Sequence, residues 1–128
     1  MNRTLTLIAA LALAAATAPA LLRAADAKPK YTIKQVMKAL HKGDVNAGTR
    51  VLDGHATKED IAQLVEYYGS LPQNDPPRGE KASWNEKTGA LVKAAQALKS
   101  GEAGALDAYK KAANCKACHT AHKPMKRN

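Results

Sequence analysis

The stretch Asn114-Cys115-Lys116-Ala117-Cys118-His119, near the C-terminus of this 128-residue chain, decides how the rest of the sequence is read. Two cysteines three positions apart, followed at once by a histidine, form the signature of c-type haem attachment. Each sulfur can bond one haem vinyl group as a thioether, and on a helix the adjacent imidazole can reach the iron on the same face. We therefore expect Cys115 and Cys118 to hold one covalent haem c, with His119 as its proximal iron ligand.

Three other interpretations use the same residues. A thioredoxin-like dithiol needs a strand–helix–strand context, whereas the surroundings of this motif are predicted to be helical. A zinc site would recruit Cys115, Cys118, His119 and His122, although structural zinc sites usually separate their two ligand pairs by a longer spacer. A disulfide between Cys115 and Cys118 would be strained on a helix. Haem attachment is the interpretation that explains both the residue types and their order.

The sixth position of the iron has candidates in the first helical segment. Met37 lies on the apolar stripe that Val36 and Leu40 share, and a thioether sulfur is a known haem ligand. A methionine on such a stripe also serves as core filler. His41 lies one turn further on the same face, as a second candidate ligand, a polar group at the haem edge or a surface residue. We expect Met37 to be the distal ligand and His41 to lie at the surface; an open sixth position is the alternative.

Four helical segments are predicted, and no strand. They start at Thr32, Thr57, Ser83 and about Glu102, and they end at Gly43, Gly69, Gly101 and Pro124. The first three starts are N-cap residues with suitable partners in the first turn. Residues 44–56 show a mixed pattern, in which Val45, Val51 and Leu52 are candidates for packing. Residues 72–82 are rich in proline and are expected to form a loop.

The first 27 residues are predicted to be a secretory signal peptide, because Arg3 precedes an uncharged apolar run over residues 5–18. Small residues offer three cleavage positions, after Ala20, Ala25 or Ala27. The run is short for a membrane-spanning helix, so we expect no stable membrane insertion after cleavage. Residues 28–128 would then form a single domain, a cytochrome c domain on the haem interpretation, exported to the periplasm.

The chain is strongly basic, with 20 Lys and Arg against 11 Asp and Glu and a net charge of +9. Nucleic acid is the usual partner of such a charge, but an exported protein does not meet it. We therefore expect acidic redox proteins as partners, steered by electrostatic attraction. Lys110, Lys111 and Lys116 are candidates for a solvated face near the haem that docks such a partner.

Four further side chains have competing interpretations. Arg78 would pair with a haem propionate or, as we expect, remain solvated at the surface. Trp84 is expected to pack in the core or at the haem edge. His55 and His122 are expected to be exposed, the first in a turn and the second at a helix end.

The expected helices, with the haem motif in the last one, resemble the class II cytochromes c, the group of cytochrome c′ and cytochrome c556. The resemblance covers residues 30–123 and is carried mainly by residues 114–119 and by Met37. It implies an all-α fold, an antiparallel four-helix bundle with covalent haem near the C-terminus. Proteins like cytochrome c556 place a methionine of the first helix on the iron, and Met37 matches that position; cytochrome c′ has a non-ligating residue there.

The resemblance implies an exported monohaem carrier that transfers single electrons. The alternative is a five-coordinate, cytochrome c′-like protein that binds NO or CO at an open sixth position. A small peroxidase would also need distal acid–base groups, for which His41 is the one candidate, so we do not expect an enzyme. A helical disulfide or zinc module would require that no haem is bound. Family members are often dimers, which leaves a homodimer open.

Overall fold

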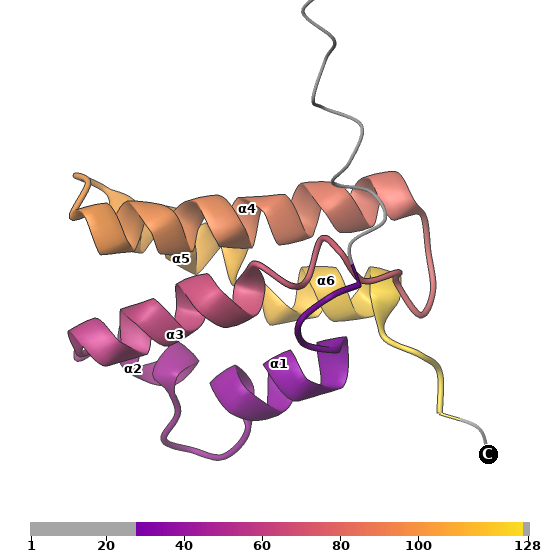
Figure 1. Ribbon diagram of the computed structural model, residues 1–128, viewed down its shortest axis with the longest axis horizontal. Helices are drawn as coiled ribbons and strands as arrows, with labels where there is room; N and C mark the ends of the chain where they lie inside the picture. The colour runs from indigo at the N-terminus through magenta and orange to yellow at the C-terminus, as the bar shows by residue number, and fades with distance from the viewer. Residues whose placement is uncertain (1–27, 127–128) are drawn as a thin grey trace, which may run out of the picture.

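The computed structural model describes residues 28–126, and the signal peptide expected over residues 1–27 lies outside this range. The described part of the chain forms six helices and no strand, which confirms the all-α class (Figure 1). Within the same range, no helix is both long and apolar enough to cross a membrane. The helices are α1 (Ile33–His41), α2 (Ala47–Leu52), α3 (Lys58–Tyr68), α4 (Lys81–Ser100), α5 (Ala105–Ala112) and α6 (Cys115–His122).

The longest helix, α4, contacts α3, α5 and α6, whereas α1 contacts α2 and α3. Figure 1 shows α4 along one side of the molecule, α1 on the opposite side, and α3 and α6 between them. Helices α3 and α4 run in opposite directions, joined by the loop over residues 69–80. Buried side chains from α1 to α5 form one core, whose largest members are Leu40, Leu64, Tyr68, Leu71, Trp84 and Tyr109.

The expected fourth helix is divided into α5 and α6, which corrects the prediction of one helix from about Glu102. Asn114 leaves the helical conformation, with φ −73° and ψ 90°. Its side-chain oxygen accepts a hydrogen bond from the Ala117 N–H at 3.0 Å. Asparagine is among the best N-cap residues, so it starts a new helix at Cys115 instead of continuing the previous one.

The third expected helix also begins earlier than predicted, at Lys81 instead of Ser83. Glu80 is the N-cap residue, with extended backbone and no side-chain capping bond. Ser83 therefore lies inside the first turn, where its hydroxyl group is within hydrogen-bond distance of His122 Nε2, at 3.2 Å. The serine that marked the helix start in the sequence is used for a contact with α6.

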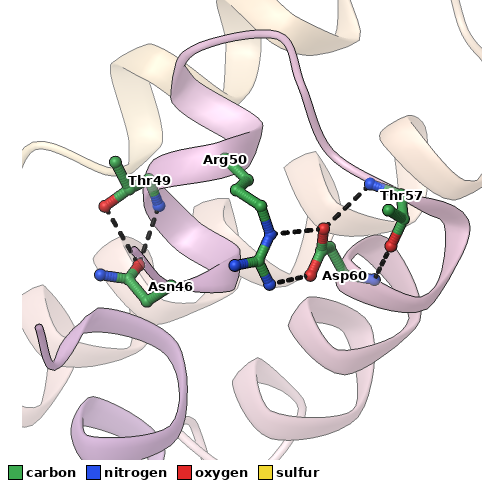
Figure 2. Close-up of polar contacts among 5 residues, drawn as sticks. All are labelled: Asn46, Thr49, Arg50, Thr57 and Asp60. Carbon is green, nitrogen blue, oxygen red and sulfur yellow. Dashed lines mark hydrogen bonds and ion pairs between the residues drawn. The ribbon is translucent and has the colours of Figure 1, made fainter. Parts of the chain in front are cut away.

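Residues 44–56, which had a mixed sequence pattern, contain the short helix α2. Asn46 caps it, because its side-chain oxygen accepts hydrogen bonds from the backbone N–H and the hydroxyl group of Thr49, at 2.9 and 3.2 Å (Figure 2). Val51 packs in the core as expected, and Leu52 is half-buried against it. Val45 is 77% exposed, so its expected packing was wrong.

A buried carboxylate joins α2 to α3. Asp60 accepts hydrogen bonds from both sides of the Arg50 guanidinium, at 2.8 Å from Nε to Oδ2 and through the second pair Nη2 and Oδ1. It also accepts from the Thr57 N–H at 2.9 Å, which completes the capping box of α3 (Figure 2). The Arg50 contact and then the Thr57 backbone hydrogen bond hold the pKa of Asp60 well below its usual range. The capping interpretation of Thr57 is confirmed.

We predict that Asp60→Asn lowers the free energy of unfolding at pH 7 by about 1–3 kcal/mol, because it leaves donors of Arg50 and Thr57 without a charged acceptor. The lower end applies, since the Arg50 side chain is 36% exposed. As the folded-state pKa of Asp60 is depressed, this contribution is complete above the ordinary Asp pKa of about 3.9. It declines at lower pH as the unfolded chain binds the proton first.

Urea unfolding at neutral and at acid pH measures the effect, and the difference between wild type and Asp60→Asn should shrink in acid. Glu66→Gln is the matched control, because Glu66 pairs with Lys30 at an exposed site. A loss at pH 7 no larger than that of the control would contradict the role of Asp60.

Candidate cofactor site

An apolar cavity of about 880 Å³ lies between α1, α4 and α6. Its walls include the side chains of Leu71, Pro77, Trp84 and Leu91. The cavity exists because α1 packs on α2 and α3, whereas α6 packs on α4, so the two helices are held on different sides of the space. Its volume lies within the range of about 300–1,000 Å³ found for ligand and cofactor sites.

Helix α1 contributes one row of side chains to the cavity, namely Ile33, Met37 and His41. Their spacing of four residues places them above one another on the helix. The neighbouring Val36 and Leu40 point into the core and are fully buried. The capping box between Thr32 and Gln35 fixes the start of this helix, as the sequence predicted, and so fixes the register of the row.

Helix α6 contributes Cys118 and His119 to the opposite wall of the same cavity. The structure therefore brings these two residues and Met37 around one space. Cys115 is the first residue of α6 and is exposed outside the lining, with its sulfur 3.5 Å from the Ala113 carbonyl oxygen. Both cysteines are free thiols, so the structure does not contain the disulfide considered from the sequence.

The environment of Cys118 disfavours a thiolate. Burial raises the pKa of its thiol, and the positive charge of Lys87 opposes this only in part. Dithiol–disulfide enzymes need a lowered thiol pKa, and this helical surrounding lacks the strand context of a thioredoxin-like site over residues 28–126. The surroundings of Cys118 therefore do not favour the dithiol–disulfide interpretation.

His122 is buried, with 2% exposure, which corrects the prediction that it lies exposed at the helix end. Its Nδ1 lies 2.8 Å from the Arg78 carbonyl oxygen, its Nε2 lies 3.2 Å from the Ser83 hydroxyl oxygen, and its ring meets the edge of Trp84. Both ring nitrogens are thus engaged. Within residues 28–126, no three His, Cys, Asp or Glu side chains converge as a metal-ion site, so the four-ligand zinc arrangement has no geometric support.

The loop before α4 is held against α6 at the same place. Arg78 donates a hydrogen bond from its guanidinium to the Thr120 carbonyl oxygen. It is half-buried, so the expectation of a solvated surface residue was wrong, and its Nε has no partner among the described residues. Gly79 has φ +80°, and a Cβ there would lie 2.8 Å from the Ala121 carbonyl oxygen. Glycine is therefore required by both the conformation and the close approach.

His41 is half-buried and not at the surface, which corrects another prediction. Its Nε2 lies 2.9 Å from the Tyr68 hydroxyl oxygen, which lies 2.9 Å from the hydroxyl oxygen of the fully buried Tyr109. Burial, with a smaller contribution from the charge of His119, lowers the pKa of His41. The neutral ring can accept a hydrogen bond from the Tyr68 hydroxyl group, which keeps its proton because burial raises the pKa of that phenol. A hydrogen-bonded chain thus links the cavity wall to the core.

The sequence identifies most of the residues at this site, but not the hydrogen bonds that hold them in place. The hydroxyl groups of Tyr68 and Tyr109 come from different helices, and no local sequence pattern predicts that they meet. Trp84 is buried as expected, and its Nε1–H donates to the Leu71 carbonyl oxygen at 3.0 Å. His55 is exposed, as predicted. No local sequence pattern predicts that His122 is buried, because its hydrogen-bond partners are about 40 residues away in the chain.

Comparisons with known proteins give no match: no family model, no curated protein and no solved structure matches this chain. The case for a cofactor therefore depends on the donor set itself. Cys115 and Cys118 supply thiols in the attachment spacing, and His119 supplies an imidazole. The surface of the cavity beside them is mainly apolar, although polar and charged side chains also line it. These residues fit a covalent haem.

We predict that Gly79→Ala lowers the free energy of unfolding by about 1–3 kcal/mol, because the left-handed backbone is costly for alanine. The added methyl group would also press on the Ala121 carbonyl oxygen and on His122. Gly89→Ala is the matched control: it lies inside α4, nothing stands within 4 Å of its added Cβ, and it should stabilise by about 0.4–1 kcal/mol. Thermal or urea unfolding of both variants measures the change in the free energy of unfolding. If Gly79→Ala changed it no differently from Gly89→Ala, the close contact between the loop and α6 would be contradicted.

Proposed function

We propose that this protein is an exported monohaem c-type cytochrome that carries single electrons. The observation that carries the proposal is the meeting of Cys118, His119 and Met37 at one apolar cavity, next to the free thiol of Cys115. The haem, when bound, would supply the one-electron chemistry at its iron. Export is supported by the signal-peptide pattern of residues 1–27.

Each side chain then has a defined task. Cys115 and Cys118 bond the porphyrin through thioethers, and His119 binds the iron from the α6 side. The apolar walls exclude water from the cavity, which favours burial of the porphyrin. Met37 is the proposed distal ligand, because it lines the cavity from the facing helix and is half-buried there.

The contacts of His41 favour Met37 over His41 at the sixth position. His41 Nε2 is engaged by the Tyr68 hydroxyl group. A Cβ at Gly48 would lie 2.7 Å from both Nδ1 and Cε1 of His41, so the other side of the ring packs against α2. Ligation by either nitrogen would therefore require the ring to leave these contacts.

The same proposal assigns the fold to the class II cytochrome group. Helices α1, α3, α4 and the divided pair α5 and α6 would be the four helical members of an antiparallel bundle, with α2 as an addition between the first two. The break at Asn114 is a departure from a continuous last helix. It starts the haem-binding motif at a helix N-terminus that is capped independently of α5.

Gas binding is the alternative function of the same site. It requires that the sixth position is open or that Met37 is easily displaced. Met37 is half-buried and lies on the cavity wall between Ile33 and His41, which favours ligation. Among the described lining residues, His41 is engaged with Tyr68, His122 is engaged with Arg78 and Ser83, and His119 is the proposed iron ligand. We therefore propose no enzyme activity.

We predict that the chain, produced in a host that matures c-type cytochromes, carries one haem per molecule through thioether bonds. Cys115→Ala and Cys118→Ala should each remove one of these bonds. Mass spectrometry after denaturation and the pyridine haemochrome spectrum measure the attachment. A mature chain without covalent haem would reject the proposed function.

We predict that the ferric holoprotein is low-spin with a methionine–iron charge-transfer band, and that carbon monoxide does not perturb the ferrous form. Met37→Ala should give a high-spin spectrum that responds to carbon monoxide, whereas His41→Ala, the matched control, should keep the low-spin spectrum. A high-spin wild type that binds carbon monoxide would instead support the gas-binding alternative. No spectral change in Met37→Ala would remove Met37 from the iron.

A further inference from the structure

Four lysines border the cavity, namely Lys34, Lys38, Lys42 and Lys123, and all of them are exposed. Among the residues that the structure describes, no Asp or Glu lines this space. We call these four residues the lysine rim. Within residues 28–126, none of them forms an ion pair. The mouth of the proposed haem cavity therefore carries an uncompensated positive charge.

The lysine rim follows from the register of α1. Lys34 and Lys38 are each one position after Ile33 and Met37, so they lie beside the row that faces the cavity. Lys42 follows His41 as the C-cap residue, with extended backbone, and also lines the cavity. Lys123 follows directly after α6 and adds a charge from the opposite side. The apolar wall and the charged border are consequently adjacent, and a group that approaches the border also approaches the cavity.

We propose that the lysine rim is the surface on which an acidic redox protein docks to exchange an electron with the group in the cavity. This inference rests on the proposed function. The partner, a one-electron carrier with a negatively charged face, would be oxidised by one electron while the ferric iron becomes ferrous, and no bond or proton would be transferred. Complementary charge raises the rate of encounter and fixes the orientation of such complexes.

The structure favours this surface over the one predicted from the sequence. Lys110 and Lys111 lie on α5, and Lys116 lies between the cysteines on α6, but none of the three lines the cavity. The haem propionates are also acidic and would use part of the rim charge. They differ from a docking partner in their effect, because loss of a propionate contact changes the haem environment even when no partner is present.

The test compares the binding of the holoprotein to a negatively charged plant-type [2Fe–2S] ferredoxin, a one-electron protein of low potential. Binding is measured by isothermal titration calorimetry at low ionic strength. The variant K34E/K38E/K42E should bind at least tenfold more weakly than wild type, and added salt should weaken wild-type binding. The control K58E/K93E/K99E has the same net charge but changes exposed lysines that do not line the cavity. It should bind within about threefold of wild type, because its changed charges lie outside the proposed docking face and do not contact the partner.

The electron-transfer rate from reduced ferredoxin, followed by stopped-flow absorbance, should fall with the binding in the rim variant. The rate at which hexaammineruthenium(II) reduces the rim variant should not fall, because this small cationic reductant has no acidic face to dock. K34Q/K38Q/K42Q provides a second variant, should the three glutamates prevent folding, and is expected to weaken binding less but in the same direction. Optical spectra and reduction potentials equal to wild type would show that the rim does not act through the propionates.

Equal weakening in the rim and control variants would overturn the docking proposal, because net charge alone would then explain binding. A shifted reduction potential with unchanged ferredoxin binding would also overturn it and would assign the lysines to the haem. These outcomes leave the proposed function intact. A chain that matures without haem would instead reject the proposed function, and the docking proposal with it, before the comparison is made.

Discussion

The position of α6 depends on the hydrogen bonds of one buried imidazole. His122 is the one buried residue of this helix, and its ring is held between the Arg78 carbonyl group and the Ser83 hydroxyl group. If the ring lost these partners, each unsatisfied buried group would destabilise the fold by about 1–3 kcal/mol, because no hydrogen bond would offset its desolvation. The ring therefore fixes α6 against the loop and α4, and Gly79 allows the backbone to come close enough.

The cavity follows from this attachment. Because α6 is fastened on the α4 side and α1 packs on α3, a space remains between them that side chains do not fill. A group that filled the space and was bonded to α6 would contact both sides at once. It would stabilise the folded chain because its apolar surface would be buried only in the folded state. Helix α6 would gain most, since a short helix with one buried residue has little packing of its own.

Local signals were sufficient for much of the fold. The capping residues Thr32 and Thr57 start their helices as predicted, because such caps act within one turn. Asn114 is also a local signal, because asparagine is a strong N-cap residue. It divides the expected last helix into α5 and α6. Ser83 is not the N-cap residue that the sequence predicted. Its hydroxyl group instead contacts His122, a residue 39 positions away. No local pattern can report such a partner.

The candidate site shows the same division between local and distant effects. The spacing of Cys115, Cys118 and His119 is local and defines the attachment motif. Met37 lines the cavity, whereas Val36 and Leu40, its neighbours on the predicted apolar stripe, are buried in the core. His41 was misplaced because its environment is set by Tyr68 from α3 and Tyr109 from α5. These hydroxyl groups fix the end of the α1 wall, and the capping box at Thr32 fixes its start. The α1 wall that carries Met37 is thus held at both ends by hydrogen bonds to other residues of the protein. Its orientation therefore does not depend on a group bound in the cavity.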